Sequence, residues 1–353
     1  MPLRHGRTGA ARRAKDVDEV DADTAGFARR PGAHRGDLCH GIGFSGRIDE
    51  KPSLDFLGQG AIMRAMTTSS PAVDVLRYAA FTSRPDGGNP AGVVLNAALL
   101  DPDRMGAIAA EVGYSETAFI TSRDEERRRF TLRYFSPLAE VAFCGHATVA
   151  TAVALAERLG PGDLLFDTPA GEIQVATATD TGGAVRAALT SVPTRSRPAR
   201  ADEVDATLSA LRWDAADLDP ELPPHVAFAG NDHLILAAGS RARLADLDYD
   251  FDALAAVMRK HGWTTVHLVW REDQQRYHAR DPFPVGGVVE DPATGAAAAA
   301  FGGYLRTVGA LPASGVVTVR QGEDMGRPSE LTVRTDPHGA RVQVTGHAVP
   351  ITG

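Results

Sequence analysis

The chain has 353 residues, of which 43% are hydrophobic, and it carries a formal net charge of -8. This length allows two domains with hydrophobic cores, and the acidic balance argues against a nucleic-acid partner, which needs clustered basic surface. No apolar run reaches the ~18 residues that a membrane helix requires, so we expect no membrane association. Its two cysteines, Cys39 and Cys144, provide no disulfide framework and fit a reducing cytoplasm.

The first 70 residues differ from the rest of the chain. Several arginines open this segment, and an acidic stretch follows at residues 16–23. Neither hydrophobic periodicity nor the apolar centre of a signal peptide occurs there. The composition therefore predicts a disordered extension over residues 1–70, to which we assign no function.

Two strands and a helix are predicted next. Residues 73–78 and 91–95 are typical of strands, and a turn-rich loop separates them. Asp101 followed by Pro102 is a typical helix start. Apolar residues at helical spacing follow, and Gly113 ends the helix.

Two further strands are predicted at residues 115–120 and 130–135. Glu116 lies at the entrance of the first of these strands, directly after the end of the helix. Loops at such entrances often carry chemistry. Glu116 is therefore a candidate catalytic residue.

Two later segments resemble each other. Residues 147–159 and 296–308 consist almost entirely of small or apolar residues, and a helix that is apolar all round is buried. The same pattern of Arg, Pro and Val at intervals of four residues precedes both segments, beginning at Arg133 and at Arg280. A repeat of this length indicates an internal duplication.

The duplication predicts an α+β protein with two pseudo-symmetric domains, each a curled, mostly antiparallel sheet around a central apolar helix. We place the first domain at residues 71–195 and the second at residues 196–353. The segment 193–201, rich in proline and arginine, is the predicted linker. We expect the active site in the cleft between the domains.

Pseudo-twofold symmetry would bring the starts of the two apolar helices face to face across this cleft. Helix N-termini offer unpaired N–H groups and partial positive charge, so we expect the cleft to hold an anion such as a carboxylate. Gly145 and Gly295 permit close approach of a ligand to the backbone. His146 and Asp291 add side chains that can donate, accept or orient.

Glu116 adds a carboxyl group that can take and return a proton. The ordinary pKa of a glutamate is about 4.3, and burial in a closed cleft raises such a pKa toward neutrality, where one residue serves as base and acid. The anion site would stabilise negative charge that develops on the substrate. This combination predicts a proton shift next to a carboxylate and needs neither a metal nor an organic cofactor.

Four motifs resemble signatures of the PhzF-like family of phenazine biosynthesis. They are Gly88-Asn89-Pro90-Ala91, Ser115-Glu116-Thr117-Ala118-Phe119, Phe143-Cys144-Gly145-His146-Ala147-Thr148 and Glu290-Asp291-Pro292-Ala293-Thr294-Gly295. A further pair, Gln321-Gly322 and Met325-Gly326-Arg327-Pro328, is similar to the C-terminal motif of the family. The resemblance covers residues 73–353 and spans both predicted domains in order.

This resemblance implies the diaminopimelate epimerase-like fold and a cofactor-independent isomerase that acts on a small carboxylate substrate, often as a homodimer. It implies that Glu116 is the general acid/base and that His146 and Asp291 are further catalytic residues. Asn89 is a candidate for substrate binding. The anion-binding backbone groups of the family fall on Gly145, His146, Gly295 and Ala296.

One position departs from the family pattern. Serine usually follows the Asp-Pro-Ala-Thr-Gly run, whereas this chain has Ala296. The backbone N–H survives this change, but a hydroxyl donor is lost. Two readings therefore stay open: an isomerase with a different substrate, or a small-molecule-binding protein of the same fold that has lost catalysis.

Cys144 raises a third possibility, because epimerases of this fold use two opposed cysteines as base and acid. The second helix entrance carries Asp291 rather than a thiol, so a two-thiol epimerase is disfavoured. Cys144 and His146 have no second pair at zinc-ligand spacing, so no metal site is expected. Arg327 suits either anion binding or a structural turn.

Overall fold

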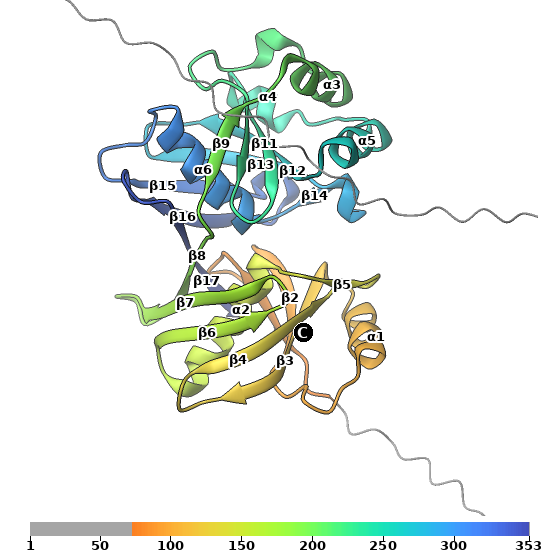
Figure 1. Cartoon of the computed structure of the whole chain (residues 1–353), viewed down its shortest axis with the longest axis vertical. Coiled ribbons are helices and arrows are strands. Elements are labelled where there is room, and N and C mark those ends of the chain that lie inside the picture. The colour runs from red at the N-terminus through yellow and green to blue at the C-terminus, as the bar shows by residue number, and fades with distance from the viewer. Residues whose placement is uncertain (1–72, 353) are drawn as a thin grey trace, which may run out of the picture. The chain divides into compact units, whose positions relative to one another are not determined.

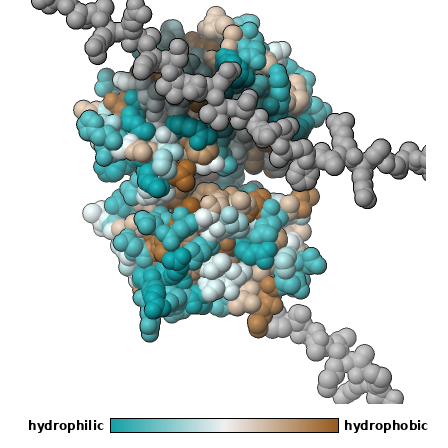
Figure 2. Space-filling model, in the orientation of Figure 1, coloured by the Kyte–Doolittle hydropathy of each residue, from teal (hydrophilic) through white to brown (hydrophobic). Residues whose placement is uncertain are grey.

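The computed structural model describes residues 73–352, and these residues belong to one compact unit that starts at Thr68. The predicted disordered extension, residues 1–70, lies outside the described range. None of the described helices is both long and apolar enough to cross a lipid bilayer. Hydrophilic side chains cover most of the visible face of the described residues, and apolar side chains gather where its upper and lower halves meet (Figure 2).

The first half of the described chain is a closed ring of strands around the helix α2 (Gly145–Leu159) (Figure 1). Its strands pair in the order β1-β2-β3-β4-β6-β7-β8, and the C-terminal strand β17 closes the ring by pairing with both β8 and β1. The helix α1 (Pro102–Val112) packs outside against β3 and β4. The strands are β1 (Leu76–Ala80), β2 (Asn89–Val94), β3 (Glu116–Asp124), β4 (Arg129–Phe135), β5 (Glu140–Val141), β6 (Gly162–Thr168), β7 (Gly171–Thr179), β8 (Val185–Thr190) and β17 (Val342–Pro350).

The second half curls a similar row of strands around the helix α6 (Gly295–Thr307), but among the described residues the first and last strands of this row do not pair with each other (Figure 1). Its strands pair in the order β9-β10-β11-β12-β13-β15-β16-β17. They are β9 (Arg195–Pro198), β10 (His225–Phe228), β11 (Asp232–Ala237), β12 (Trp263–Arg271), β13 (Arg276–Pro282), β14 (Glu290–Asp291), β15 (Val316–Gln321) and β16 (Ser329–Thr335).

The two halves share one pattern of strand directions. The pairs β2–β3 and β4–β6 are parallel in the first half, and the pairs β11–β12 and β13–β15 are parallel in the second. Every other strand pair within residues 73–352 is antiparallel. This matching order confirms the predicted fold class, in which two pseudo-symmetric, mostly antiparallel sheets each curl around an apolar helix.

The remaining short elements belong to the second half. The helices α3 (Ala201–Leu211) and α5 (Phe251–His261) contribute Leu211, Leu254 and Met258 to a separate hydrophobic cluster with β11 and β12. The helix α4 (Arg241–Ala245) contacts β12 and β13. Three single 3-10 turns complete the described chain, η1 (Ala215–Asp217), η2 (Pro284–Gly286) and η3 (Glu323–Met325).

The two central helices are buried because their side chains are small and apolar on all sides. Every residue of the stretches 146–156 and 297–305 is buried. The hydroxyl groups in α2 are paired inside the helix, since Thr148 donates to the carbonyl of Cys144 at 2.6 Å and Thr151 to that of Ala147 at 2.8 Å. Both helices begin on a glycine, earlier than the sequence predicted.

The chain crosses between the halves at two places. β8 leads into β9, which pairs with β10, whereas β17 pairs with β16 along its first residues and with β1 along its last. The first of these crossings overlaps the start of the predicted linker, 193–201, and the rest of that segment includes β9, whose backbone hydrogen-bond partners lie in the second half. One hydrophobic cluster includes residues of both α2 and α6. The predicted boundary between residues 195 and 196 stays a prediction.

Candidate active site

The helices α2 and α6 begin next to each other. A Cβ atom added to Gly145 would lie 3.9 Å from the Cα of Gly295. Cys144 and Thr294 occupy the N-cap positions, and neither side chain caps its helix. Two uncapped N-termini carry positive partial charge toward each other, which is unfavourable unless an anion lies between them. This contact makes the helix starts a candidate carboxylate site.

A small apolar cavity adjoins the two helix starts. The predicted residues Gly145, Gly295 and Ala296 line it, and among residues 73–352 no charged side chain does. The cavity has a volume of about 20 Å³, room for about one water molecule, so a larger ligand enters only when the lining moves apart. Its remaining lining is Phe81, Phe143, Val149, Leu189, Ser191, Ala229, Ala299 and Val344.

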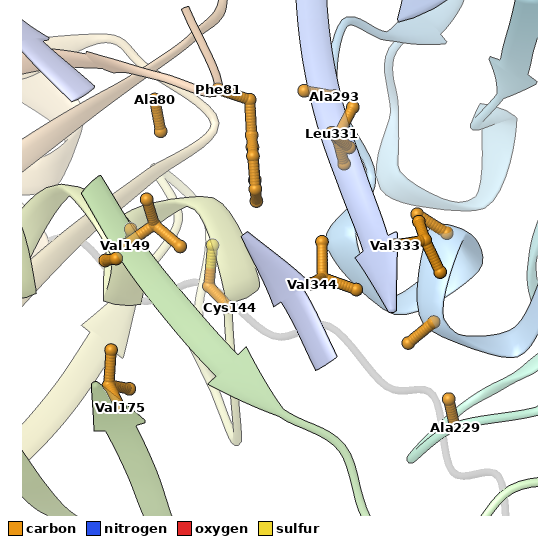
Figure 3. Packing of buried hydrophobic residues seen from close by; sticks show 14 of the residues in the cluster. Ala80, Phe81, Cys144, Val149, Val175, Ala229, Ala293, Leu331, Val333 and Val344 are labelled. Atoms are coloured by element: carbon orange, nitrogen blue, oxygen red, sulfur yellow. The ribbon is translucent and has the colours of Figure 1, made fainter. Parts of the chain in front are cut away.

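Phe81 is a residue of this cavity that the sequence analysis missed. Its ring extends into the space between Cys144, at the start of α2, and Val344 of the strand β17 (Figure 3). The backbone φ of Phe81 is 63°, a left-handed conformation that costs a bulky residue about 1–3 kcal/mol. Hydrogen bonds hold this conformation, since the N–H donates to the carbonyl of His347 at 2.7 Å and the carbonyl accepts from the N–H of Glu330 at 2.8 Å.

The carboxylate of Glu116 lies beside the start of α2. Glu116 is the first residue of β3 and pairs with Ala91 of the parallel strand β2. Its Oε2 is 3.4 Å from Nε2 of His146, and the thiol of Cys144 donates to the same oxygen at 3.5 Å. The side chain of Glu116 is 16% exposed and that of His146 is 7% exposed. The carboxylate therefore has a narrow opening to ligands and little access to bulk water.

His146 is held by Glu116 on one side and by Asn89 on the other. Burial lowers the pKa of His146, and Glu116 opposes this effect only in part, so the imidazole is neutral at pH 7. The amide nitrogen of Asn89 lies 3.2 Å from Nδ1. This donor favours the tautomer that carries its proton on Nε2, facing Glu116.

Asp291 completes a connected row of polar side chains. Its Oδ1 accepts from the amide of Asn89 at 2.8 Å, and its Oδ2 accepts from the hydroxyl of Thr294 at 2.6 Å. Burial raises the pKa of Asp291 to about 7, and the nearby charge of Glu116 adds to this rise. The structure thus brings the three candidate catalytic residues and Asn89 together, although their roles stay predictions.

Two residues of the C-terminal motif hold the turn that carries Asp291. Gln321 is fully buried, and its amide donates to the carbonyl of Asp291 at 2.8 Å and accepts from the N–H of Thr294 at 3.1 Å. Ser329 donates to the carbonyl of Pro292 at 2.9 Å. Sequence reasoning placed Gln321 in a motif but gave it no role, because its partners lie on a distant segment of the chain.

Arg327 has a structural contact in this arrangement. Its guanidinium donates to the carbonyls of Gly88 at 2.8 Å and Gly87 at 2.7 Å. It thereby fixes the loop that precedes Asn89. Of the two roles considered from the sequence, these contacts favour the structural one.

The position of Cys144 argues against its use as a second base. Burial raises the pKa of its thiol well above the ordinary value, and the charge of Glu116 raises it further. Two groups that act on opposite faces of one carbon stand about 6–7 Å apart, since each approaches the carbon to about 3–3.5 Å. Cys144 and Glu116 are only 3.5 Å apart, so they approach a substrate from the same side.

The fold and the site together define a class of protein, an enzyme of the diaminopimelate epimerase-like fold with a sheltered carboxylate between two helix starts. A solved hydroxyproline epimerase from Agrobacterium vitis has the same fold, with a TM-score of 0.54 and 13% identity over 79% of this chain and 90% of that one. This likeness shows the fold alone.

The chain belongs to the PhzC-PhzF family of phenazine biosynthesis-like proteins, whose family model matches residues 78–353. An uncharacterized isomerase of Deinococcus radiodurans is 34% identical over 283 residues, which are 78% of this chain and 91% of that relative. The trans-2,3-dihydro-3-hydroxyanthranilate isomerase of Pseudomonas aeruginosa is 29% identical over 277 residues, 78% of this chain and 93% of that relative. A solved PhzF-family protein of Bacillus anthracis has a TM-score of 0.71 and 26% identity over 79% of this chain and 97% of that one. These similarities confirm the resemblance and the enzyme class, isomerase.

The raised pKa of Asp291 predicts a pH dependence of stability. An aspartate in the unfolded chain has a pKa of 3.8, whereas folded Asp291 has one of about 7, so between these values the folded protein keeps a proton that the unfolded chain has lost. The resulting stabilisation is full below about pH 4 and is lost as the pH rises through 7. Relative to Asp291→Asn, the unfolding free energy of the wild type should fall by about 4 kcal/mol from pH 4 to 8.

Urea unfolding of both proteins across this pH range measures the difference. Because the asparagine variant has no proton to lose at this position, the subtraction removes the pH effects that the two proteins share. A difference that stays constant, or that grows as the pH rises, would show that Asp291 is not protonated in the folded protein.

Proposed function

We propose that this protein is a cofactor-independent isomerase that moves a proton within a small, carboxylate-bearing substrate. The observation that carries the proposal is the sheltered carboxylate of Glu116 beside two opposed, uncapped helix starts. Nearby, Asn89 connects His146 to Asp291. A proton shift next to a carboxylate requires a base and an anion site that lie close together.

In the proposed mechanism the two helix starts and the lining of the small apolar cavity move apart, the substrate carboxylate binds between Gly145 and Gly295, and its body enters the widened cavity. Glu116 removes a proton from a carbon near the carboxylate. The negative charge that develops on the substrate is stabilised by the helix N–H groups. Protonated Glu116 then returns its proton to a different carbon of the same face, so one residue serves as base and then as acid.

The substrate class proposed here follows the relative from Pseudomonas aeruginosa, whose name describes an isomerase of a hydroxyanthranilate, an unsaturated ring with a carboxylate. The side chains that line the cavity are mostly apolar, which suits a hydrocarbon ring once the lining has moved apart to admit it. Ala296 has no hydroxyl group, whereas serine is usual in the family at this position. We therefore expect a substrate that makes one polar contact fewer there than the substrates of serine-containing relatives. A homodimer in the cytoplasm remains a prediction of the family resemblance.

Solvent exchange tests the proposed function. The protein is incubated in D₂O with a panel of unsaturated ring and open-chain carboxylic acids, and deuterium at carbon is followed by NMR. We expect isomerisation of at least one ring carboxylate. The carbon that gains the proton should take up less than one deuterium atom per turnover, because Glu116 returns part of the hydrogen that it removed. Binding of several acids without exchange or isomerisation in any would instead favour the binding protein that has lost catalysis.

A further inference from the structure

The ring of Phe81 occupies space beside both helix starts. A Cβ atom added to Gly295, the first residue of α6, would lie 3.3 Å from Cζ at the tip of the ring. Phe81 also lines the small cavity together with Gly145, the first residue of α2. With the ring in place, the cavity of about 20 Å³ has no room for a substrate. The ring therefore lies where the proposed function requires the body of the substrate.

The surrounding chain is shaped to hold this ring. A Cβ atom added to Gly346 of β17 would lie 2.3 Å from Cδ1 of Phe81, so the ring fits against the strand because this residue is a glycine. The left-handed backbone of Phe81 is held by its hydrogen bonds to His347 and Glu330. Strained backbone of this kind clusters at ligand-binding sites and at segments that switch between conformations. The strain thus points to a role for Phe81 in ligand binding.

Phe81 also adjoins a second, larger cavity. This cavity has a volume of about 520 Å³, and Phe81 is the one residue of the range 73–352 that lines both cavities. Most of its other lining residues are polar or charged, among them Thr82, Glu330 and His347. The larger cavity has room for a phenyl ring but surrounds it with polar groups. Without a substrate, the apolar position beside the helix starts is therefore the favoured one for the ring.

We propose that Phe81 is a specificity-determining residue, whose ring turns into the larger cavity and is replaced beside the helix starts by the ring of the substrate. The proposal rests on the proposed function, because it takes the helix starts as the binding site of the substrate carboxylate. An unsaturated ring of similar size restores the contacts that Phe81 gives up, whereas an open-chain acid leaves part of the space empty. Transfer of the Phe81 ring to polar surroundings lowers the affinity for any ligand about 10- to 100-fold. Ring carboxylates are therefore bound in preference to open-chain acids.

Benzoate binding to the full-length protein tests the proposal, since benzoate joins a phenyl ring to a carboxylate. Phe81→Ala opens, beside the helix starts, the space that this ring needs. By calorimetry we expect the variant to bind benzoate about tenfold or more tightly than the wild type does. Benzamide, which has nearly the same shape without the charge, should bind the variant about tenfold more weakly than benzoate. In NMR spectra benzoate should shift the amide signals of Gly145 and Gly295.

The matched control is Phe119→Ala, which removes the same ring elsewhere. Phe119 is also fully buried, but it packs against Phe135 in a separate hydrophobic cluster with α1, so its loss should leave the benzoate affinity unchanged. If Phe81→Ala is poorly folded, Phe81→Leu frees part of the same space and should raise the benzoate affinity about threefold.

Three results would overturn the proposal: no gain in benzoate affinity in a folded Phe81 variant, an equal gain in Phe119→Ala, or benzamide bound to Phe81→Ala as tightly as benzoate. None of these measurements needs turnover. A wild type that isomerises a ring carboxylate while Phe81→Ala shows no gain would remove only the role of Phe81. A wild type without isomerisation or exchange would contradict the proposed function and leave the benzoate result in place.

Discussion

Glu116→Gln is expected to reduce isomerisation and solvent exchange at least about 1,000-fold, because general acid/base catalysis contributes about 10²–10⁴ to a rate. Glutamine has nearly the same shape as glutamate but cannot take up a proton from carbon. The helix starts that hold the substrate carboxylate are unchanged by this substitution. Substrate affinity should therefore stay within a few fold of the wild type, so that the loss falls on kcat.

The measurement is deuterium incorporation at carbon, followed by NMR, together with ligand affinity from calorimetry. The matched control is Glu111→Gln, an exposed residue of α1 five positions earlier in the chain, and it should retain full exchange. Exchange in Glu116→Gln within tenfold of the wild type would remove Glu116 from the proton transfer. A parallel loss of exchange and affinity would point instead to a role in binding.

Glu290→Gln is expected to lower the unfolding free energy by about 3 kcal/mol, since it leaves a buried arginine without its partner. Arg280 and Glu290 form a bidentate ion pair, with N–O distances of 3.0 and 2.6 Å. Their side chains are 11% and 3% exposed. Burial raises the pKa of Glu290, and Arg280 opposes that rise, so the carboxylate depends on the guanidinium for its charge. Glu290 also precedes Asp291 in β14, and its loss should disturb the site.

The internal duplication supplies the control for this prediction. Arg133 and Glu140 form the equivalent pair in the first half, with two bonds of 2.7 Å, but their side chains are 28% and 35% exposed. Water screens this pair, so Glu140→Gln should cost at most about 1 kcal/mol. Thermal and urea unfolding of the two variants compare them directly. Equal losses would show that burial does not decide the strength of the pair.

The sequence predicted the helix α1 and the two central helices well because their signals are local. Asp101 accepts from the N–H of Arg104, and Gly113 ends α1 with a φ of 72°, as capping rules require. The apolar composition of residues 147–159 and 296–308 was enough to predict buried helices. The repeat that begins at Arg133 and Arg280 predicted the duplication, although the carboxylates that pair with these arginines were missed.

The strands were predicted less accurately, because a strand needs a partner. The first predicted strand, residues 73–78, is shifted toward the C-terminus in the structure, to Leu76–Ala80. Its last residues pair with the C-terminal strand β17, across more than 260 positions of sequence. The strand β9 was missed for the same reason, since its partner β10 lies beyond the helix α3. Local propensity carries no information about such distant pairing.

The sequence by itself determined the fold class, the family and the identity of the candidate site residues, because these depend on composition, on a repeat and on short motifs. Only the tertiary structure decided that Cys144 and His146 meet Glu116, that Gln321 holds the turn of Asp291, and that Phe81 enters the cavity in a left-handed conformation. Each of these contacts joins segments distant in the chain. Their distances and burial set the pKa values and hydrogen bonds on which the proposed chemistry depends.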